Sequence, residues 1–269
     1  MYWVVGNNMY SEENFENLLT TLKRLDLPHS VHCVRPFVGD LDPELPTPDG
    51  NIIVMGSYTL ARIAKRRGWY PGAFLDDLDY REHCARWGDA MLNYDATYSG
   101  FGYISERREP FFIRPTEDTK AFTGEVTDWP SYVEWRDRVL ALTPEDNPTV
   151  TKDTRVVVSS KKEIYNETRT WIIDKRVVTC SGYKVGTIKR YSPPETVDPR
   201  IIKFAEDHAR WWSPNRAYVM DIADTPNGLK IVEINNLNSA GWYRCDMQKL
   251  IMALEDMPFP EVAQHVEEP

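Results

Sequence analysis

The first third of the chain alternates between short apolar runs and segments in which apolar residues recur at every third or fourth position. This alternation of strand and helix patterns is typical of an α/β domain. The apolar runs predict strands at residues 2–5, 31–34 and 52–55. The periodic segments predict a helix at residues 11–25 with Ser11 as its N-cap, and a second helix capped by Ser57 that stops at Gly68.

Strand patterns dominate the chain from about residue 150 onward. We expect a mostly antiparallel sheet there, built from residues 155–159, 165–173, 176–181, 217–222 and 229–234. A further short strand is predicted at residues 111–113, and helices are predicted at residues 128–142, 199–211 and 245–254. The stretch around Trp87 and Tyr94 reads as irregular, and residues 40–50, rich in Pro and Asp, read as a loop.

The polar run at residues 105–110 separates the two patterns. The sequence therefore predicts an α/β N-terminal domain at residues 1–105 and an α+β domain at residues 106–260. Within the second domain we expect a small subdomain at about residues 106–154 and a larger one, which holds the antiparallel sheet, at about residues 155–260.

Composition excludes several classes of protein. With 269 residues, 42% of them hydrophobic, the chain can bury a substantial core. Its 32 Lys and Arg residues against 41 Asp and Glu residues give a net charge of −9, which disfavours a protein that coats nucleic acid. No run approaches the roughly 20 apolar residues of a membrane-spanning helix. The N-terminus lacks a signal-peptide pattern, so we expect a soluble cytoplasmic protein.

The four cysteines lie far apart, and none belongs to a C-x-x-C pair. This spacing indicates neither a zinc site nor a disulfide framework, and we interpret them as buried free thiols. His32 precedes Cys33, but neighbours on a strand point to opposite faces, so we do not interpret the two as a base and its nucleophile.

Candidate chemistry concentrates in residues 230–243, KIVEINNLNSAGWY. Glu233 and Asn235 share one face of the predicted strand because side chains alternate. The strand before it, YVMDI, carries Asp221, and TPNG provides the turn between the two strands. If that connection has an odd number of residues or a bulge, Asp221 lies on the same face as Glu233. With two or four residues and no bulge, the two acids face apart.

Two neighbouring carboxylates repel each other unless a cation lies between them. Mg²⁺ takes hard oxygen ligands and completes its shell with waters and phosphates, so we expect Asp221, Glu233 and the amide oxygen of Asn235 to bind it. The alternative is that the two acids are solvated side chains at strand ends.

Three cations are candidates for phosphate binding. Arg114 and Lys120 belong to FFIRPTEDTKAFTG, where an apolar strand leads into a polar loop; a solvated charged loop is the alternative. Arg169 lies in a predicted strand, and its anionic partner is either Glu167 or a transferring phosphoryl group. No Walker loop occurs, and SGFGYI at residues 99–104 lacks a complete dinucleotide fingerprint.

The segment RVVVSS supplies candidate nucleotide contacts in Val157, Val158 and Ser159, because an apolar strand can stack against adenine while its backbone reads the ring edge. Glu163 is a candidate acceptor for ribose hydroxyls.

The segment SGYKVGTIKR, which contains Lys184, fits a solvated basic loop best, with an anchor for an acidic second substrate as the alternative. The small residues Ser239 and Gly241 either leave room for an acceptor carboxylate or form a tight turn into the last helix.

The order of these motifs along the chain resembles that of the ATP-grasp superfamily: FFIRP, TEDTKAFTG, VVVSS with a following E-x-R, Asp221 and EIN. More narrowly, it resembles a clade found in phages and bacteria whose substrates are mostly unassigned. The likeness covers residues 109–254 in motif detail, and the residues before it look like the domain that precedes the grasp in that clade. The resemblance implies two α+β subdomains that clamp ATP, with one or two Mg²⁺ ions at Asp221, Glu233 and Asn235.

The same resemblance matches Arg114 and Lys120 to phosphate cations and Arg169 to a strand arginine near the transferred phosphate. It therefore places Arg114 and Arg169 in catalytic roles. The chain departs from the family pattern in three ways: it has Arg114 where many members have lysine, its loop contains only Gly124, and no upstream lysine matches between Tyr94 and Arg108.

The implied activity is a carboxylate–amine ligase that forms a C–N bond through an acyl phosphate and releases ADP and phosphate. Its substrates would be small-molecule, peptide or protein carboxylates and amines, in the host cytoplasm if a phage encodes the protein. A homodimer is compatible with the sequence, whereas a membrane or nucleic-acid partner is not expected. The alternatives are an ATP-dependent phosphotransferase and a nucleotide-binding regulatory module without catalysis.

Overall fold

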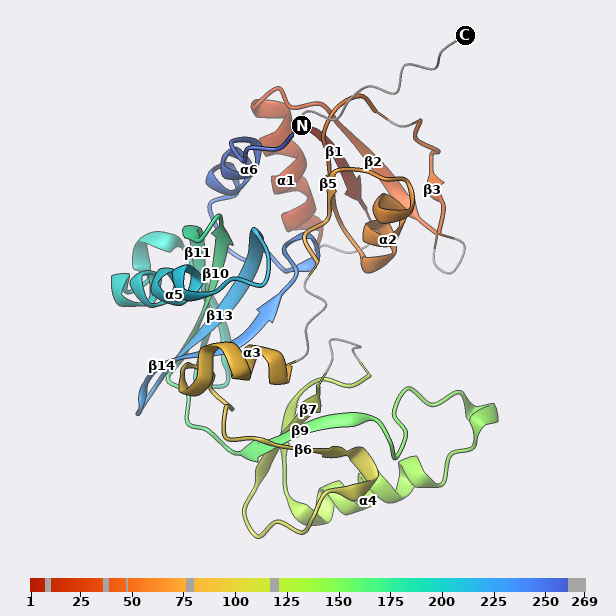
Figure 1. Ribbon diagram of the computed structural model, residues 1–269, viewed down its shortest axis with the longest axis vertical. Coiled ribbons are helices and arrows are strands. Elements are labelled where there is room, and N and C mark those ends of the chain that lie inside the picture. Colours follow the sequence, from red (N-terminus) through yellow and green to blue (C-terminus); the bar gives the residue numbers. More distant parts are fainter. Residues whose placement is uncertain (8–10, 36–38, 47, 76–79, 117–120, 261–269) are drawn as a thin grey trace. The chain divides into compact units, whose positions relative to one another are not determined.

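The computed structural model describes residues 1–7, 11–35, 39–46, 48–75, 80–116 and 121–260 (Figure 1). The chain forms two compact units. Unit 1 consists of Met1–Asp76, Asn166–Ile222 and Ile234–Pro269, and unit 2 consists of Asp77–Tyr165 and Ala223–Glu233. Each unit therefore contains residues from both of the sequential domains expected from the sequence.

Unit 1 begins with a mainly parallel sheet in the order β3-β2-β1-β4-β5. Apolar residues on its two faces pack against different helices, because side chains alternate along a strand. Val4 and Val54 share a core with Leu60 of α2, whereas Trp3 and Val5 belong to a second core. The elements are β1 (Tyr2–Gly6), α1 (Glu12–Arg24), β2 (His29–Val34), β3 (Leu41–Asp42), β4 (Ile52–Met55), α2 (Tyr58–Arg66) and β5 (Pro71–Gly72). The predicted α/β pattern of this region is confirmed.

The N-terminus of α2 shows how the sequence sets a local boundary. The hydroxyl of Ser57 accepts a hydrogen bond from the Leu60 amide at 3.3 Å, as expected for an N-cap. Gly68 follows the helix with φ +69°, a left-handed conformation that glycine adopts without a steric penalty.

A five-stranded sheet follows in the order β12-β11-β10-β13-β14. Pairing is antiparallel between β10 and β11 and between β11 and β12. Figure 1 shows α5 beside β10 and β11. The strands are β10 (Asn166–Ile173), β11 (Arg176–Val185), β12 (Ile188–Ser192), β13 (Ala217–Thr225) and β14 (Gly228–Asn235), and the helices are α5 (Pro199–Trp211) and α6 (Met247–Glu255). Trp171 and Leu250 join the core that contains Trp3.

The segment SGYKVGTIKR forms the hairpin of β11 and β12, so the favoured interpretation as a loop was wrong. The physical reason is local: Gly186, at φ +58°, allows a tight turn between Val185 and Ile188, which pair across the hairpin. A Cβ atom at Gly182 would overlap the hydroxyl of Ser192, so a larger residue there would require that hydroxyl to rotate away.

Unit 2 contains a four-stranded antiparallel sheet in the order β6-β9-β7-β8. One face packs against α4, where Phe111, Ile113, Val156 and Val158 share a core with Tyr132. The elements are α3 (Tyr80–Trp87), β6 (Thr97–Gly100), β7 (Phe111–Pro115), β8 (Glu125–Thr127), α4 (Trp129–Leu140) and β9 (Arg155–Ser160).

Two expectations for this region were wrong. β9 pairs with β6 and β7 and does not belong to the five-stranded sheet. A strand's own pattern shows that one face is buried but does not identify its neighbours. The stretch around Trp87 contains the helix α3, whose apolar residues Tyr80 and Trp87 are buried.

Short 3₁₀ turns link several of these elements: η1 (Gly88–Ala90), η2 (Phe101–Tyr103), η3 (Pro144–Asp146), η4 (Pro194–Thr196) and η5 (Leu237–Ser239). Within the described ranges, no helix has the length and apolar content needed to cross a membrane.

The four cysteines differ in exposure. Cys180 and Cys245 are buried, Cys84 is half-buried and Cys33 is exposed, so the expectation of buried thiols is wrong for Cys33. Burial raises the pKa of Cys180 to about 11 and that of Cys245 to about 12. His32, next to Cys33, is buried and hydrogen-bonds to the Pro43 carbonyl and the Ser30 hydroxyl.

We expect Cys33 to react rapidly with an aromatic disulfide reagent at pH 8, and Cys180 and Cys245 to react only after unfolding. A raised pKa keeps the two buried thiols protonated at this pH, and only a thiolate attacks the reagent. The aromatic thiol that the reagent releases in the fast phase measures how many cysteines react in the native protein. Cys33→Ser is the control, because it should remove the fast reaction of Cys33. Rapid labelling of Cys180 or Cys245 in the native protein would contradict the burial.

A core substitution in α6 is expected to lower stability much more than a surface substitution on the same helix. Leu250 is 1% exposed in the unit 1 core, whereas Met252 is 46% exposed. Leu250→Ala should lower the free energy of unfolding by about 2–5 kcal/mol, because it removes buried methyl groups and leaves a cavity. Met252→Ala should change it by less than about 0.5 kcal/mol. Urea unfolding curves measure both, and equal losses would contradict the packing.

Candidate functional site

A buried ion pair in unit 1 joins Arg169 of β10 to Asp221 of β13. Arg169 donates from Nε to Oδ1 at 2.8 Å and from Nη2 to Oδ2 at 2.7 Å. The side chains are 7% and 2% exposed. Two parallel hydrogen bonds fix the guanidinium and the carboxylate in one plane, and burial strengthens both.

Arg169 also holds the segment that follows η5. Its Nη1 donates to the Gly241 carbonyl at 3.1 Å, and its guanidinium lies 4.7 Å from the ring centre of Tyr243. The bidentate partner of Arg169 is thus Asp221, whereas Glu167, the candidate partner from the sequence, accepts from Lys184 at 2.9 Å. Arg169 therefore links β10, β13 and the chain after η5.

Lys184 lies in the hairpin strand β11, with its amine 4.6 Å from the ring centre of Tyr183. Burial opposes its charge, but the hydrogen bond and the attraction to Glu167 raise the pKa of Lys184 above its ordinary value. Lys184 therefore stays positively charged beside the ring of Tyr183, which Arg169 also approaches.

Asn235 lies at the end of β14 and donates from Nδ2 to Asp221 Oδ2 at 3.3 Å. Only two residues, Pro226 and Asn227, separate β13 from β14. A two-residue turn alone would place Asp221 and Asn235 on opposite faces of the hairpin. The contact shows that the side chain of Asn235, at the end of β14, nevertheless reaches that of Asp221 in the middle of β13.

The donor chemistry at Asp221 and Asn235 fits Mg²⁺. Carboxylate and amide oxygens are hard ligands of the type that this ion prefers. Asn235 presents its amide nitrogen to Asp221, so its amide must turn over to present the oxygen. Within the described ranges, no three or more His, Cys, Asp or Glu side chains are placed together to hold a metal. The expected magnesium ligands include only two such residues, Asp221 and Glu233, because the third is the amide of Asn235.

In unit 2, Arg114 of β7 contacts Glu233, the third expected metal ligand. Arg114 Nη1 lies 3.2 Å from Glu233 Oε2, and its guanidinium lies 5.2 Å from the ring centre of Tyr80. Burial raises the pKa of Tyr80 well above its ordinary value, and the positive charge of Arg114 opposes that shift. Tyr80 was not identified from the sequence, because its helix was not predicted.

The candidate nucleotide contacts on β9 are enclosed by protein. Val157 and Val158 are buried, and the Ser159 hydroxyl donates to Asn93 Oδ1 at 2.9 Å. Val158 packs in the core with α4, whereas Val157 pairs across the sheet with Arg114. Nucleotide binding by these three residues stays a prediction.

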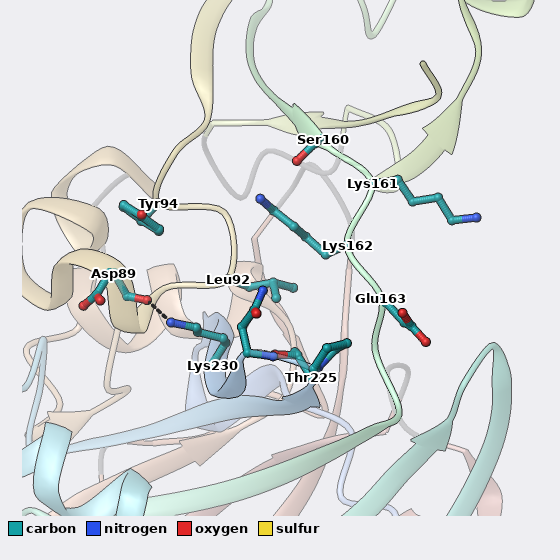
Figure 2. Close-up of a pocket in the computed structure, with 11 residues that line it drawn as sticks. Asp89, Leu92, Tyr94, Ser160, Lys161, Lys162, Glu163, Thr225 and Lys230 are labelled. Atoms are coloured by element: carbon teal, nitrogen blue, oxygen red, sulfur yellow. Dashed lines mark hydrogen bonds between the residues drawn. The ribbon is translucent and has the colours of Figure 1, made fainter.

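A pocket of about 550 Å³ in unit 2 lies beside the chain that follows β9 (Figure 2). Ser160, Lys161, Lys162 and Glu163 line one side, and the turn between β13 and β14 lines another. Figure 2 shows Lys230 directed at the carbonyl of Asp89, to which it donates at 2.6 Å. Glu163, the candidate ribose acceptor, thus borders a pocket whose size suits a small organic ligand.

Three further candidate residues from the sequence are Lys120, Ser239 and Gly241. Lys120 lies outside the described residues. Ser239 is half-buried at the end of η5, and Gly241 accepts the hydrogen bond from Arg169.

The chain contains a second arginine–aspartate pair that serves as a matched control for Arg169 and Asp221. Arg216 donates to both oxygens of Asp174 with the same two nitrogens and to the Pro258 carbonyl with the third. The side chains of this pair are 38% and 42% exposed, so the two pairs differ mainly in burial.

We expect Arg169→Met to lower the free energy of unfolding by about 3–5 kcal/mol, because it leaves the Asp221 carboxylate buried without its partner. Arg216→Met should cost less than about 1 kcal/mol, because water replaces the lost contact. Chemical unfolding of both variants measures the difference. Equal losses would show that burial does not control the strength of the Arg169 pair.

Comparison with known proteins identifies the fold. The ATP-grasp ligase PsnB, whose structure contains a minimal precursor, is 10% identical over 94% of this chain and 97% of that chain, with a TM-score of 0.54. D-alanine–D-alanine ligase from Bacillus anthracis is 11% identical over 95% and 96%, with a TM-score of 0.55. An ATP-grasp RimK domain protein from Sphaerobacter thermophilus is 16% identical over 88% and 92%, with a TM-score of 0.58. At these identities the similarity establishes the fold alone.

No curated protein matches the chain. Residues 42–254 match the ATP-grasp domain of the R-2-K clade, family 3. The predicted ATP-grasp fold and its α+β class are therefore confirmed. Because the match covers well over half of the chain, the protein belongs to family 3 of this clade of ATP-grasp domains.

Proposed function

We propose that the protein is an ATP- and Mg²⁺-dependent ligase that joins a carboxylate to an amine. Its family and the ligases that share its fold support an ATP-using ligase. The observation that carries the proposal is the buried Asp221 carboxylate, which hydrogen-bonds to Arg169 and Asn235. Burying a carboxylate is costly, and a metal-binding role at this position gives a functional reason for it.

The proposal assigns Mg²⁺ to Asp221, Glu233 and Asn235. When bound, the ion would neutralise charge on the phosphate oxygens of ATP and polarise them. Arg169 orients the Asp221 carboxylate through its two hydrogen bonds. Arg114 would contribute positive charge near the phosphates, as would Lys120.

The reaction would proceed in two steps. An oxygen of the substrate carboxylate attacks the γ-phosphorus of ATP, so that ADP leaves and an acyl phosphate forms. The nitrogen of an amine then attacks the acyl carbon and loses a proton, and inorganic phosphate leaves. The protein accelerates such phosphoryl transfer mainly by positioning the reactants and stabilising charge.

The nucleotide part of the proposal rests on Val157, Val158 and Ser159 for the base and on Glu163 for the ribose. Lys184 and the small residues Ser239 and Gly241 are the proposed substrate contacts. The PsnB structure contains a minimal precursor, and the Bacillus anthracis ligase is named for D-alanine. Small-molecule and peptide carboxylates are therefore both suitable first substrates to test. A cytoplasmic setting belongs to the same proposal.

Glu233→Gln is expected to reduce Mg²⁺-dependent ADP release by at least about 100-fold while the protein stays folded. The substitution removes a proposed ligand charge, and a metal supplies several kcal/mol of charge stabilisation in such reactions. Glu233 is 34% exposed, and its partner Arg114 keeps its contact with the ring of Tyr80, so we expect the fold to persist. ADP release over a panel of carboxylate and amine pairs measures the effect.

Glu206→Gln is the matched control, since Glu206 is also partly buried and also pairs with an arginine, Arg210. It should leave ADP release unchanged. Full activity of Glu233→Gln would refute the assignment of this residue. ADP release without an amide product would instead identify a phosphotransferase, and ATP binding without turnover of any pair would identify a regulatory module.

A further inference from the structure

Several parts of unit 2 hold the side chain of Arg114 in place. Its Nη1 lies 3.2 Å from Glu233 Oε2, and its Nε donates to the Pro115 carbonyl at 3.3 Å. A Cβ atom at Gly124 would lie 3.2 Å from the Cβ of Arg114, so the chain there packs closely against the base of the side chain. A long side chain that is held in this way loses less entropy when it binds a ligand.

The guanidinium of Arg114 also lies over the ring of Tyr80. The two residues come from different elements, β7 and α3, and the guanidinium carbon is 5.2 Å from the ring centre. At this separation a cation is attracted to the face of an aromatic ring. An arginine suits such a contact because its planar guanidinium stacks on a ring, whereas a lysine ammonium is a compact point charge.

Tyr80 is itself held at both ends. It begins α3, where its backbone amide donates to the Thr116 carbonyl at 3.2 Å, and its hydroxyl accepts from the Asn93 amide at 3.3 Å. The residue is buried. These bonds join the start of α3 to the residue after β7 and to the segment after η1, so the ring has a defined place beside Arg114.

The contact uses the ring of Tyr80 and not a charge on its hydroxyl. Burial raises the pKa of Tyr80 well above its ordinary value, and the positive charge of Arg114 only partly opposes that shift. The hydroxyl is therefore neutral at physiological pH, and the attraction comes from the face of the ring. Phenylalanine at this position would keep that face.

Arg114 and Tyr80 meet on the face of the unit 2 sheet that α4 does not cover. Phe111 and Ile113 of β7 belong to the core with α4, and Arg114 extends from the opposite face because side chains alternate. Val157, one of the proposed nucleotide contacts, is the direct cross-strand partner of Arg114 and shares that face. The guanidinium thus lies on the same side of the sheet as a proposed nucleotide contact.

Part of the guanidinium is left for a ligand. Nη2 of Arg114 donates to no residue in the described part of the chain, and the side chain is 19% exposed. An arginine binds phosphate oxygens best with two neighbouring nitrogens in one plane. The orientation of that plane therefore matters for phosphate binding.

We propose that Tyr80 is a positioning residue, whose ring fixes the plane of the Arg114 guanidinium for the phosphates of ATP. The inference rests on the proposed function for the identity of the anion, and on the contacts of Tyr80 for the way in which the arginine is oriented. Tyr80 acts through Arg114 and does not itself touch the phosphates.

The alternative is that Tyr80 only packs α3 against the rest of unit 2. A packing role predicts that removal of the ring weakens every ligand of the site by the same factor. A positioning role predicts a loss that is confined to ligands with phosphates and that requires Arg114. Ligands with and without phosphates therefore distinguish the two roles.

The test compares the β,γ-imido analogue of ATP with adenosine, and binding of each to the full chain with Mg²⁺ is measured by titration calorimetry. We expect Tyr80→Leu to weaken binding of the analogue about three- to thirtyfold and of adenosine less than about twofold, because the guanidinium loses its orientation. Tyr80→Phe keeps the ring and should stay within about twofold of the wild type for both ligands. An equal loss for both ligands in Tyr80→Leu overturns the inference.

A double-mutant cycle tests whether Tyr80 acts through Arg114. In an Arg114→Met background, Tyr80→Leu should weaken binding of the analogue by less than about twofold more, because no guanidinium is left to position. Two losses that multiply in the double variant overturn the inference.

Arg114→Lys tests the orientation without a change in α3, so it also applies if Tyr80→Leu does not fold. It keeps the charge but loses the planar group, and we expect binding of the analogue to weaken at least about threefold. Unchanged affinity in Arg114→Lys would show that orientation of a planar cation is not needed, and would overturn the inference.

Tyr132→Leu is the matched control. Tyr132 is also a buried tyrosine of unit 2, its hydroxyl donates to the Phe101 carbonyl, and Arg136 lies over its ring at 6.0 Å. It belongs to the core with α4, on the other face of the sheet. The variant should lower stability without changing the ratio of the two affinities. A change of that ratio as large as in Tyr80→Leu overturns the inference.

The outcome is separable from that of the proposed function. Binding of the analogue that does not depend on Tyr80 would refute the inference alone. Binding that depends on Tyr80, without ADP release from any pair of substrates, would support the role of Tyr80 and refute the ligase reaction. No binding of the analogue to the wild-type chain would refute both.

Discussion

The buried ion pair between Arg169 and Asp221 is the contact on which the candidate site of unit 1 depends. A buried carboxylate is tolerated only with a partner that supplies charge and hydrogen bonds, and Arg169 supplies both. The same guanidinium binds the Gly241 carbonyl and lies 4.7 Å from the ring centre of Tyr243, so one side chain positions both the acid and the chain after η5. The pair of Arg216 and Asp174 has the same two hydrogen bonds and also binds a backbone carbonyl, but it is exposed, so burial is what distinguishes the two pairs.

Arg169 and Asp221 extend from the same face of the sheet as residues of the core that includes α6. Trp171 lies two residues beyond Arg169 on β10, and Val219 lies two residues before Asp221 on β13; both belong to the core that includes α6. Apolar packing therefore fixes the strands from which the ionic side chains extend. A site built on packed strands keeps its geometry better than one on loops. On the neighbouring hairpin of β11 and β12, the rings of Tyr183 and Tyr191 lie nearly parallel, 6.3 Å apart.

The chain's membership of the ATP-grasp family accounts for its fold. The bidentate pairing of Arg169, the contact of Arg114 with both Glu233 and Tyr80, and the three stacked tyrosines are features of this structure. They are where its substrate preference should be sought, because the side chains that a shared fold carries determine specificity.

The sequence by itself determined the local elements and the residue types of the site. Periodicity located α5 at residues 199–211 and β4 at residues 52–55, and the alternation along β14 placed Glu233 and Asn235 on one face, because these features depend only on neighbouring residues. Only the tertiary structure decided that β9 pairs with β6 and β7, that Arg169 holds Asp221, and that Tyr243 meets Tyr183 and Tyr191. Strand partners and ion pairs join residues that are distant in the chain. Each strand or charged side chain could have paired with several others of similar chemistry. The choice among them depends on how the whole core packs, which no local pattern contains.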